Sequence, residues 1–224
     1  MCPNPDCGGY QDGRRRCASC GTKFTGQHLS SVTLTPPTQS AVLCEHVTET
    51  LITGVTAPGF DERLPRRPSD PFGRLHWVSV HGGAGESTLA ALVPGSIDSG
   101  GAWPCAPDLE TDEIFPTPVI LVARTHVPGL LAAQTALREW ASGVVQPVQM
   151  LGIVLVEDIP GRPPKVIRDL SKLVAGGAPA RWRVSYFHAL REGISVDSVN
   201  APDLKRLRTE VRRLIKEFRK CKLS

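Results

Sequence analysis

Four of the seven cysteines lie within the first twenty residues, in a spacing that suits a metal site. Cys2 and Cys7 are separated by four residues, and Cys17 and Cys20 by two. Two short turns of this kind can present four thiolates to one zinc ion, each at about 2.3 Å. We therefore expect Cys2, Cys7, Cys17 and Cys20 to bind a structural Zn²⁺. The spacing leaves two alternatives open, a disordered cysteine-bearing tail and an iron–sulfur cluster.

The segment around these cysteines is too small to fold without a metal. Residues 1–26 are rich in Cys, Gly and Arg and contain almost no aliphatic residues. Such a segment cannot bury a core of its own, so zinc would supply most of its folding free energy. The stretches CPNPDCGG and CASCGTKF resemble short zinc ribbons. Arg14, Arg15 and Arg16 in the ribbon loop could contact DNA phosphates or an acidic protein partner, or could form a solvated loop.

A second candidate site is the glycine-rich stretch HGGAGEST, which follows an apolar run and precedes an apolar helical pattern. In a phosphate-binding loop, successive backbone N–H groups curl around phosphates at the start of a helix. The glycines permit that curl, whereas the Ser87 hydroxyl would bind Mg²⁺ and Thr88 would contact a phosphate. The alternative is a tight turn without a ligand. The candidate nucleotide-binding residues are Gly82, Gly83, Gly85, Glu86, Ser87 and Thr88.

The glycine loop and the stretches after it resemble one known family. HGGAGESTLAAL is similar to the deviant Walker A loop, KGGxGK[ST], of the ParA/MinD family of P-loop ATPases. The stretches PVILVARTHVPGLLAAQTALREW, LGIVLVEDIPG and RVSYFHALREG resemble later elements of that family, so the likeness spans roughly residues 74–196. The whole chain also looks like uncharacterised ParA-like proteins encoded with mobile elements of high-GC bacteria. The resemblance implies a P-loop NTPase fold with ATP and Mg²⁺ as ligands.

Both signature lysines of that family are replaced in this chain. His81 holds the first lysine position and Glu86 the second. A carboxylate in place of a cation beside the phosphates exchanges attraction for repulsion, each worth roughly 4 kcal/mol at about 4 Å and an effective dielectric near 20. At a helix N-terminus, in contrast, a carboxylate is favourable by about 0.3–1 kcal/mol. We therefore hypothesise that Glu86 occupies the anion site and makes the domain a pseudo-NTPase, with no catalytic residue assigned.

The acidic residues of the family are missing as well. About thirty residues separate the loop helix from the run PVILVA, too few for the usual intervening strands. Asp98, Asp108 and Asp112 lie there, but none ends an aliphatic strand pattern. The sequence therefore predicts no aspartate in the role of magnesium ligand.

The elements that must position these sites lie in residues 74–224, where short aliphatic runs alternate with helical patterns. Strands are predicted at 75–80, 118–123, 150–156 and 181–187, and helices at 86–93, 128–143, 163–177 and along the basic C-terminal segment. Aliphatic strands separated by helices indicate a parallel sheet covered on both faces. The predicted fold class is α/β, with a short, mostly parallel P-loop-type sheet flanked by helices and a small N-terminal zinc-ribbon module.

Polar residues follow two of the predicted strands. Arg124, Thr125 and His126 come after the second strand, and Asp158 comes after the third. Ligands of open α/β sheets bind outside the carboxyl ends of the strands. These residues are therefore candidate pocket residues, with ordinary polar loop residues as the alternative.

The basic C-terminal segment predicts an amphipathic helix. Its apolar stripe consists of Leu204, Leu207, Val211, Leu214, Phe218 and Cys221. These residues recur every three or four positions, opposite a face rich in Lys and Arg. We expect the stripe to pack against the sheet. A homodimer seam, or a surface that faces DNA or a membrane, remains open.

Composition divides the chain of 224 residues into three zones. Residues 1–26 are the predicted ribbon, 27–73 a connecting segment that ends in a proline-rich linker or surface loop, and 74–224 the α/β domain. The N-terminus lacks the apolar region of a secretory signal, and no apolar run reaches about 18 residues, so we expect a cytoplasmic protein. The leading functional hypothesis is a non-catalytic adaptor or regulatory protein that contacts a protein or DNA partner. The alternatives are an active Mg²⁺-dependent ATPase and a zinc-ribbon DNA-binding protein.

Overall fold

The computed structural model describes residues 54–69, 73–105, 116–145 and 147–221. The predicted zinc ligands Cys2, Cys7, Cys17 and Cys20 lie outside the described residues, as do the ribbon arginines and most of the connecting segment. Zinc binding therefore stays a prediction.

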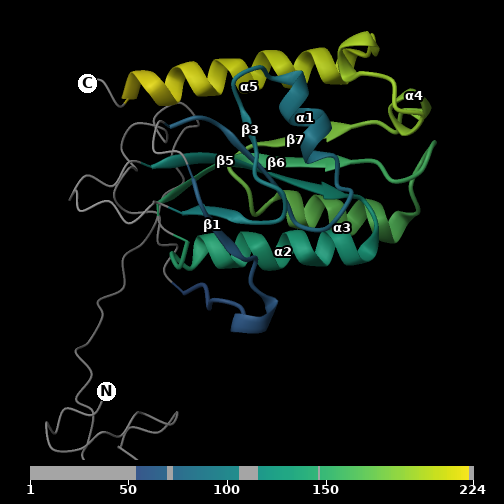
Figure 1. Cartoon of the computed structure of the whole chain (residues 1–224). Helices are drawn as coiled ribbons and strands as arrows, with labels where there is room; N and C mark the ends of the chain where they lie inside the picture. Colours follow the sequence, from purple (N-terminus) through teal and green to yellow (C-terminus); the bar gives the residue numbers. More distant parts are fainter. Residues whose placement is uncertain (1–53, 70–72, 106–115, 146, 222–224) are drawn as a thin grey trace, which may run out of the picture. The chain divides into compact units, whose positions relative to one another are not determined.

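A five-stranded parallel sheet forms the centre of the domain (Figure 1). In spatial order its strands are β3 (Ile97–Asp98), β2 (His76–Ser79), β5 (Thr117–Arg124), β6 (Val148–Val156) and β7 (Arg181–Val184). The residues of β2 and nearly all those of β5 and β6 are buried, as expected of parallel strands covered on both faces. The predicted α/β class with a mostly parallel sheet is confirmed.

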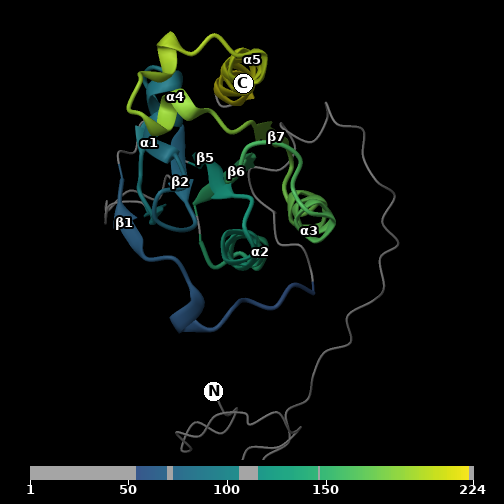
Figure 2. The same ribbon diagram turned by 90° about the vertical axis from the view of Figure 1, so that its right-hand side faces the viewer.

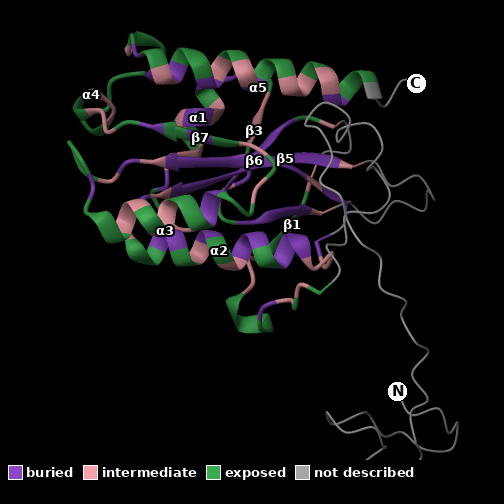
Figure 3. Ribbon diagram, turned by 180° about the vertical axis from the view of Figure 1, so that it is seen from behind, coloured by how far each residue is buried: buried purple, intermediate pink, exposed green. Residues whose placement is uncertain are grey.

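Helices cover both faces of this sheet (Figures 1 and 2). α1 (Glu86–Leu92) and α5 (Pro202–Cys221) lie on one face, and α2 (Val127–Ala141) and α3 (Lys165–Ala175) lie on the other. Because side chains alternate along a strand, each strand contributes to two cores. Val78 and Leu121 belong to the core beneath α2 and α3, whereas Trp77 and Ile120 belong to the core beneath α1 and α5. Figure 3 shows the buried residues concentrated on the strands.

The C-terminal helix α5 packs its apolar stripe on the sheet, as predicted. Leu204, Leu207, Val211 and Phe218 are buried in the core that α5 shares with α1. The indole Nε1 of Trp182 on β7 donates to Glu210 Oε2 at 2.7 Å and adds a polar contact between sheet and helix. No helix among the described residues is both long enough and apolar enough to cross a membrane.

Several short elements depart from the sequence prediction. The proline-rich segment that predicts a linker or surface loop contains a 3-10 helix, η1 (Phe60–Glu62), and strand β1 (Arg66–Pro68). Strand β1 pairs in parallel with β4 (Trp103–Cys105) in a separate two-stranded sheet. The short helix α4 (His188–Arg191) and the 3-10 helix η2 (Val196–Ser198) follow β7. Strands β1 and β4 depend on each other across more than thirty residues, so local composition does not reveal them.

Candidate functional site

The sheet has a change in connection direction between β2 and β5. From β2 the chain runs through α1 to β3 on one side, whereas from β5 it runs through α2 to β6 on the other side. Such a switch leaves a crevice at the carboxyl ends of the two neighbouring strands, where open α/β folds bind ligands. The glycine loop follows β2, and Arg124 ends β5, so the fold brings both predicted groups to this crevice.

The glycine loop leads directly into α1 and has a backbone conformation that its glycines permit. Gly83 and Gly85 have φ of 71° and 107°, in the left-handed region where only glycine is unstrained. A Cβ atom at either position would meet no atom within 4 Å, so backbone conformation rather than packing requires these glycines. Gly85 is the N-cap of α1 but has no side chain that could cap the helix.

The Glu86 carboxylate accepts a hydrogen bond from one of the backbone N–H groups of this loop. Its Oε2 accepts a hydrogen bond from the backbone N–H of Gly85 at 3.0 Å. In a phosphate-binding loop, N–H groups at this point face the ligand. The carboxylate therefore supplies the loop with an anion from within the chain.

Two contacts from the end of β5 hold the other side of the loop. The Arg124 backbone N–H donates to His81 Nε2 at 3.0 Å, and the Arg124 Nε–H donates to the carbonyl of Gly83 at 2.7 Å. Since Nε2 of His81 accepts, its Nδ1 carries the proton and donates to the Gly82 carbonyl at 3.0 Å. His81, at the position of the first family lysine, thus acts as a neutral structural link between the glycine loop and β5.

His126 and Gly129 pack closely against this link at the start of α2. His126 is the N-cap of α2, and its Nδ1 accepts from the Gly129 N–H at 2.9 Å. The His126 and His81 rings lie with their centroids 4.8 Å apart. A Cβ atom on Gly129 would come within 2.7 Å of His81 Nε2 and of the Arg124 carbonyl oxygen, so the position requires glycine.

A small pocket of about 80 Å³ lies at the carboxyl edge of the sheet, beside the glycine loop. Gly85 and Thr88 line it from the loop and α1, and Arg124 lines it from the end of β5. Further walls come from the ends of β6 and β7, from α4 and from the start of α5. Of the predicted loop residues, Gly85 and Thr88 reach this pocket, whereas Ser87 is exposed to solvent.

Charged residues surround the pocket and form two ion-pair groups. The Asp158 carboxylate lies between two arginines, with its Oδ1 3.5 Å from Arg124 Nη1 and 3.8 Å from Arg191 Nη2. Glu157 instead pairs with Arg183. Burial lowers the pKa of Arg124, the positive charge of Arg191 lowers it further, and Asp158 opposes both effects.

The sequence predicts part of this site and misses the rest. Arg124 and Asp158 meet as an ion pair, Thr125 Oγ1 accepts from the Asp158 N–H at 3.3 Å, and His126 caps α2. Arg191 and Tyr186 belong to the pocket but were not predicted, because Tyr186 lies in the irregular segment after β7 and Arg191 on a four-residue helix that no periodic pattern marks. The available signal for Arg191 was its position just after the fourth predicted strand, at the same edge as Arg124, whereas Tyr186 fell within that predicted strand, which in the structure ends at Val184.

The interval between α1 and β5, predicted to be too short for intervening strands, contains the short strands β3 and β4. Asp98 ends the two-residue β3, which pairs with β2 in the main sheet but contains no aliphatic run. Its Oδ1 accepts from the Gly100 N–H at 2.8 Å, and Asp98 is exposed. The strand is too short to give an aliphatic pattern, which explains why the sequence did not reveal it.

Within the described ranges, no three His, Cys, Asp or Glu side chains come together in a way that could hold a metal ion. The four candidate zinc ligands are not among the residues to which this finding applies.

Neither a curated protein nor a solved structure matches the chain. A family model matches residues 74–206, which are more than half of the chain and include the glycine loop, the pocket and the start of α5. The protein therefore belongs to DUF6668, a family of unknown function.

Proposed function

We propose that the α/β domain is a pseudo-NTPase, a P-loop-type domain of ParA/MinD character that does not use nucleotide for catalysis. In this proposal the protein acts as an adaptor or regulatory protein. Its cysteine ribbon, with bound zinc, or its helix α5 provides the contact with a partner. The observation that carries the proposal is the hydrogen bond from the Gly85 N–H to Glu86 Oε2.

This hydrogen bond opposes nucleotide binding in two ways. A phosphate oxygen would have to replace the carboxylate on the Gly85 N–H, so the incoming ligand gains less than it would from a free donor. The Glu86 charge would also repel the phosphate, by an amount on the order of 4 kcal/mol at about 4 Å and an effective dielectric near 20. Both effects disappear when the carboxylate is removed, which makes the proposal testable by substitution.

An active Mg²⁺-dependent ATPase is the rival proposal, and it needs a cation from elsewhere to replace the lysine at position 86. Arg124 is a cation held against the glycine loop. However, its Nε–H is bonded to the Gly83 carbonyl and its Nη1 lies 3.5 Å from Asp158. Arg124 would have to leave both partners to reach a phosphate, so this arrangement favours the pseudo-NTPase.

The test is calorimetric titration of the zinc-loaded full chain with ATP and Mg²⁺. We expect no binding by the wild type, measurable binding by Glu86→Gln, and binding at least about tenfold tighter again by Glu86→Lys. Glutamine removes the repulsion, and lysine adds an attraction in its place, with each 1.4 kcal/mol worth a factor of about ten. Asp169→Lys is the control, because it makes the same charge change as Glu86→Lys but on α3, on the other face of the sheet. We expect no ATP binding by this variant.

Two results would contradict the pseudo-NTPase. Micromolar ATP binding by the wild type would support the ATPase, and hydrolysis would then be measured. If no variant binds ATP although thermal melts show that each of them is folded, the glycine loop is only a structural turn.

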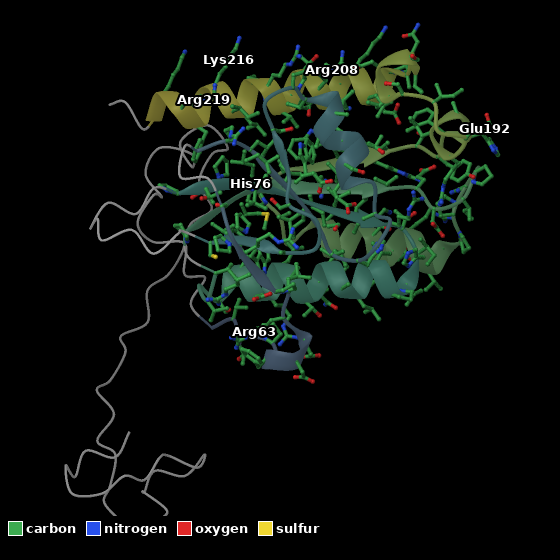
Figure 4. All side chains as sticks on the ribbon, in the orientation of Figure 1. Arg63, His76, Glu192, Arg208, Lys216 and Arg219 are labelled. Carbon is green, nitrogen blue, oxygen red and sulfur yellow. The ribbon has the colours of Figure 1, made fainter. Side chains whose placement is uncertain are left out.

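A second candidate function, DNA binding, is favoured by the outer side of α5. Four cations there are exposed and form no ion pair with a described residue: Lys205, Arg212, Lys216 and Arg219. Their spacing of seven, four and three residues places them on one side of the helix. Figure 4 shows Lys216 directed outward from α5. In contrast, Arg206 and Arg213 are paired with Glu210 and Glu217.

The DNA proposal predicts a salt-dependent affinity that depends on the unpaired cations. In fluorescence anisotropy with a duplex oligonucleotide, we expect Arg212→Gln with Lys216→Gln to weaken binding and to lower the salt slope by about one per lost phosphate contact. Arg213→Gln, which removes a paired cation from the same helix, is the control. Equal affinities for all three proteins would eliminate α5 as the DNA surface.

A further inference from the structure

The pocket at the carboxyl edge of the sheet contains positive charge that its own carboxylates do not neutralise. Arg124 and Arg191 share the single Asp158 carboxylate, whose Oδ1 lies 3.5 Å and 3.8 Å from their nearest nitrogens. Asp158 itself does not line the pocket; Glu157 does, and its charge is paired with Arg183, which lies outside the lining. Two guanidinium groups therefore face one carboxylate, and one positive charge remains.

We propose that this pocket binds a small phosphate-type oxyanion between Arg124 and Arg191. The site goes beyond the pseudo-NTPase role, because it needs no nucleotide and does not use the Gly85 N–H that Glu86 occupies. Among the described ion pairs, none joins Glu86 to either arginine, so Glu86 does not neutralise the positive charge that Asp158 leaves over.

The hydrogen-bonding capacity of the two arginines supports an oxyanion as the ligand. A guanidinium group carries five N–H donors in a fork that matches two oxygens of one anion. Arg124 uses its Nε–H for the Gly83 carbonyl, and its Nη1 lies 3.5 Å from Asp158 Oδ1. Arg191, as far as the described residues go, makes only the 3.8 Å ion pair with Asp158 and a cation–π contact with Tyr186, with its Cζ 5.9 Å from the ring centroid. Donors therefore remain available on both sides of the pocket.

The size and the walls of the pocket favour a ligand of few atoms. Its volume of about 80 Å³ is far below the roughly 300–1,000 Å³ typical of sites for larger organic ligands. Val156, Val184 and Leu204 form apolar walls beside the arginines. Apolar walls lower the local dielectric and so strengthen the attraction between an arginine and an anion. Thr88 also lines the pocket, and a threonine carries one neutral hydroxyl donor.

A bound oxyanion would join elements that are distant in the chain. Arg124 ends β5 and is linked to the glycine loop, whereas Arg191 ends α4. The side chain of Arg191 is half exposed in the structure, at 51%, so an anion that draws it toward Arg124 would order α4 against the sheet. The ligand would thereby couple the position of α4, through Arg191, to the position of the glycine loop, through Arg124.

The test is calorimetric titration of the full chain with sodium phosphate, with sodium chloride at equal ionic strength as the reference. We expect saturable phosphate binding by the wild type and at least a tenfold loss in Arg191→Gln. Asp158→Asn removes the competing carboxylate and should tighten phosphate binding several-fold. Arg213→Gln is the control, because Arg213 is an exposed arginine paired with Glu217 and neither residue lines the pocket, and it should bind as the wild type does.

Opposite effects of the Arg191 and Asp158 substitutions are the signature of an anion site. A purely structural ion-pair cluster would respond to both substitutions in the same direction. The proposal would be overturned if titration with phosphate released no more heat than titration with chloride. It would also be overturned if the wild type and Arg191→Gln bound phosphate with equal affinity. Tighter binding of AMP or ATP than of phosphate by more than tenfold would also overturn it, since the site would then recognise a nucleotide. The phosphate titrations do not depend on whether Glu86→Lys binds ATP. The phosphate site and the pseudo-NTPase can therefore be disproved independently.

Discussion

Gly152→Ala is expected to lower the free energy of unfolding by about 3 kcal/mol, the upper part of the range for overpacking a dense core. Gly152 lies in β6, and its partner in β5 is Ile120. A Cβ atom at this position would come within 2.5 Å of the Ala180 carbonyl oxygen and 2.6 Å of the Trp182 ring. The Ala180 carbonyl accepts from the Ile153 N–H at 2.9 Å, so the added methyl would push β7 away from β6.

The damage should extend to α5 through Trp182. The Trp182 indole donates to Glu210 on α5, so a displaced β7 weakens the contact between sheet and helix. Urea unfolding followed by tryptophan fluorescence measures the loss, with Gly82→Ala as the control. A Cβ atom on Gly82 meets no atom within 4 Å and its φ is not positive, so that variant should stay within about 0.5 kcal/mol of the wild type. Equal free energies of unfolding for the two variants would show that β7 can move away from β6 without loss of stability.

Glu139→Ala is expected to cost about 3 kcal/mol, because it leaves two donors without an acceptor and opens a cavity. Glu139 lies on α2 with no solvent exposure. Its Oε2 accepts from the Trp103 indole N–H at 2.8 Å and from the Leu64 backbone N–H at 3.2 Å. These bonds join the segments around β1 and β4 to the main domain. Protection of the Leu64 amide from hydrogen exchange should therefore fall more than the protection of amides in β5.

Glu139→Gln separates the role of the acceptor from the role of the charge. Glutamine keeps one oxygen that can accept from both donors. Its amide nitrogen would take the place of Glu139 Oε1, which has no hydrogen-bond partner among the described residues. We expect Glu139→Gln to lie within about 1 kcal/mol of the wild type, since a neutral amide avoids the cost of a buried charge. A loss as large as that of Glu139→Ala, measured by the same urea unfolding, would show instead that the negative charge is required.

The local pattern was sufficient to predict the long elements. β5, β6, α2, α3 and α5 were all predicted to within a few residues, because an aliphatic run or a helical stripe is itself the cause of burial. The stripe of α5 lies on the core for the same reason. Local chemistry permits the left-handed conformations of Gly83 and Gly85, since these positions have no side chain to restrict φ, but it does not determine them, because Gly82 in the same loop has no positive φ.

Tertiary structure alone decided how the site is assembled. The link between His81 and Arg124 spans 43 residues, and Asp158 and Arg191 meet from the end of β6 and from α4. Strands β1, β3 and β4 have two or three residues each and exist only because a distant partner completes their hydrogen bonds. The physical reason is common to all of them. A hydrogen bond or an ion pair between residues far apart in sequence depends on the order and register of the strands that carry them, whereas hydrophobic periodicity depends on neighbouring residues only.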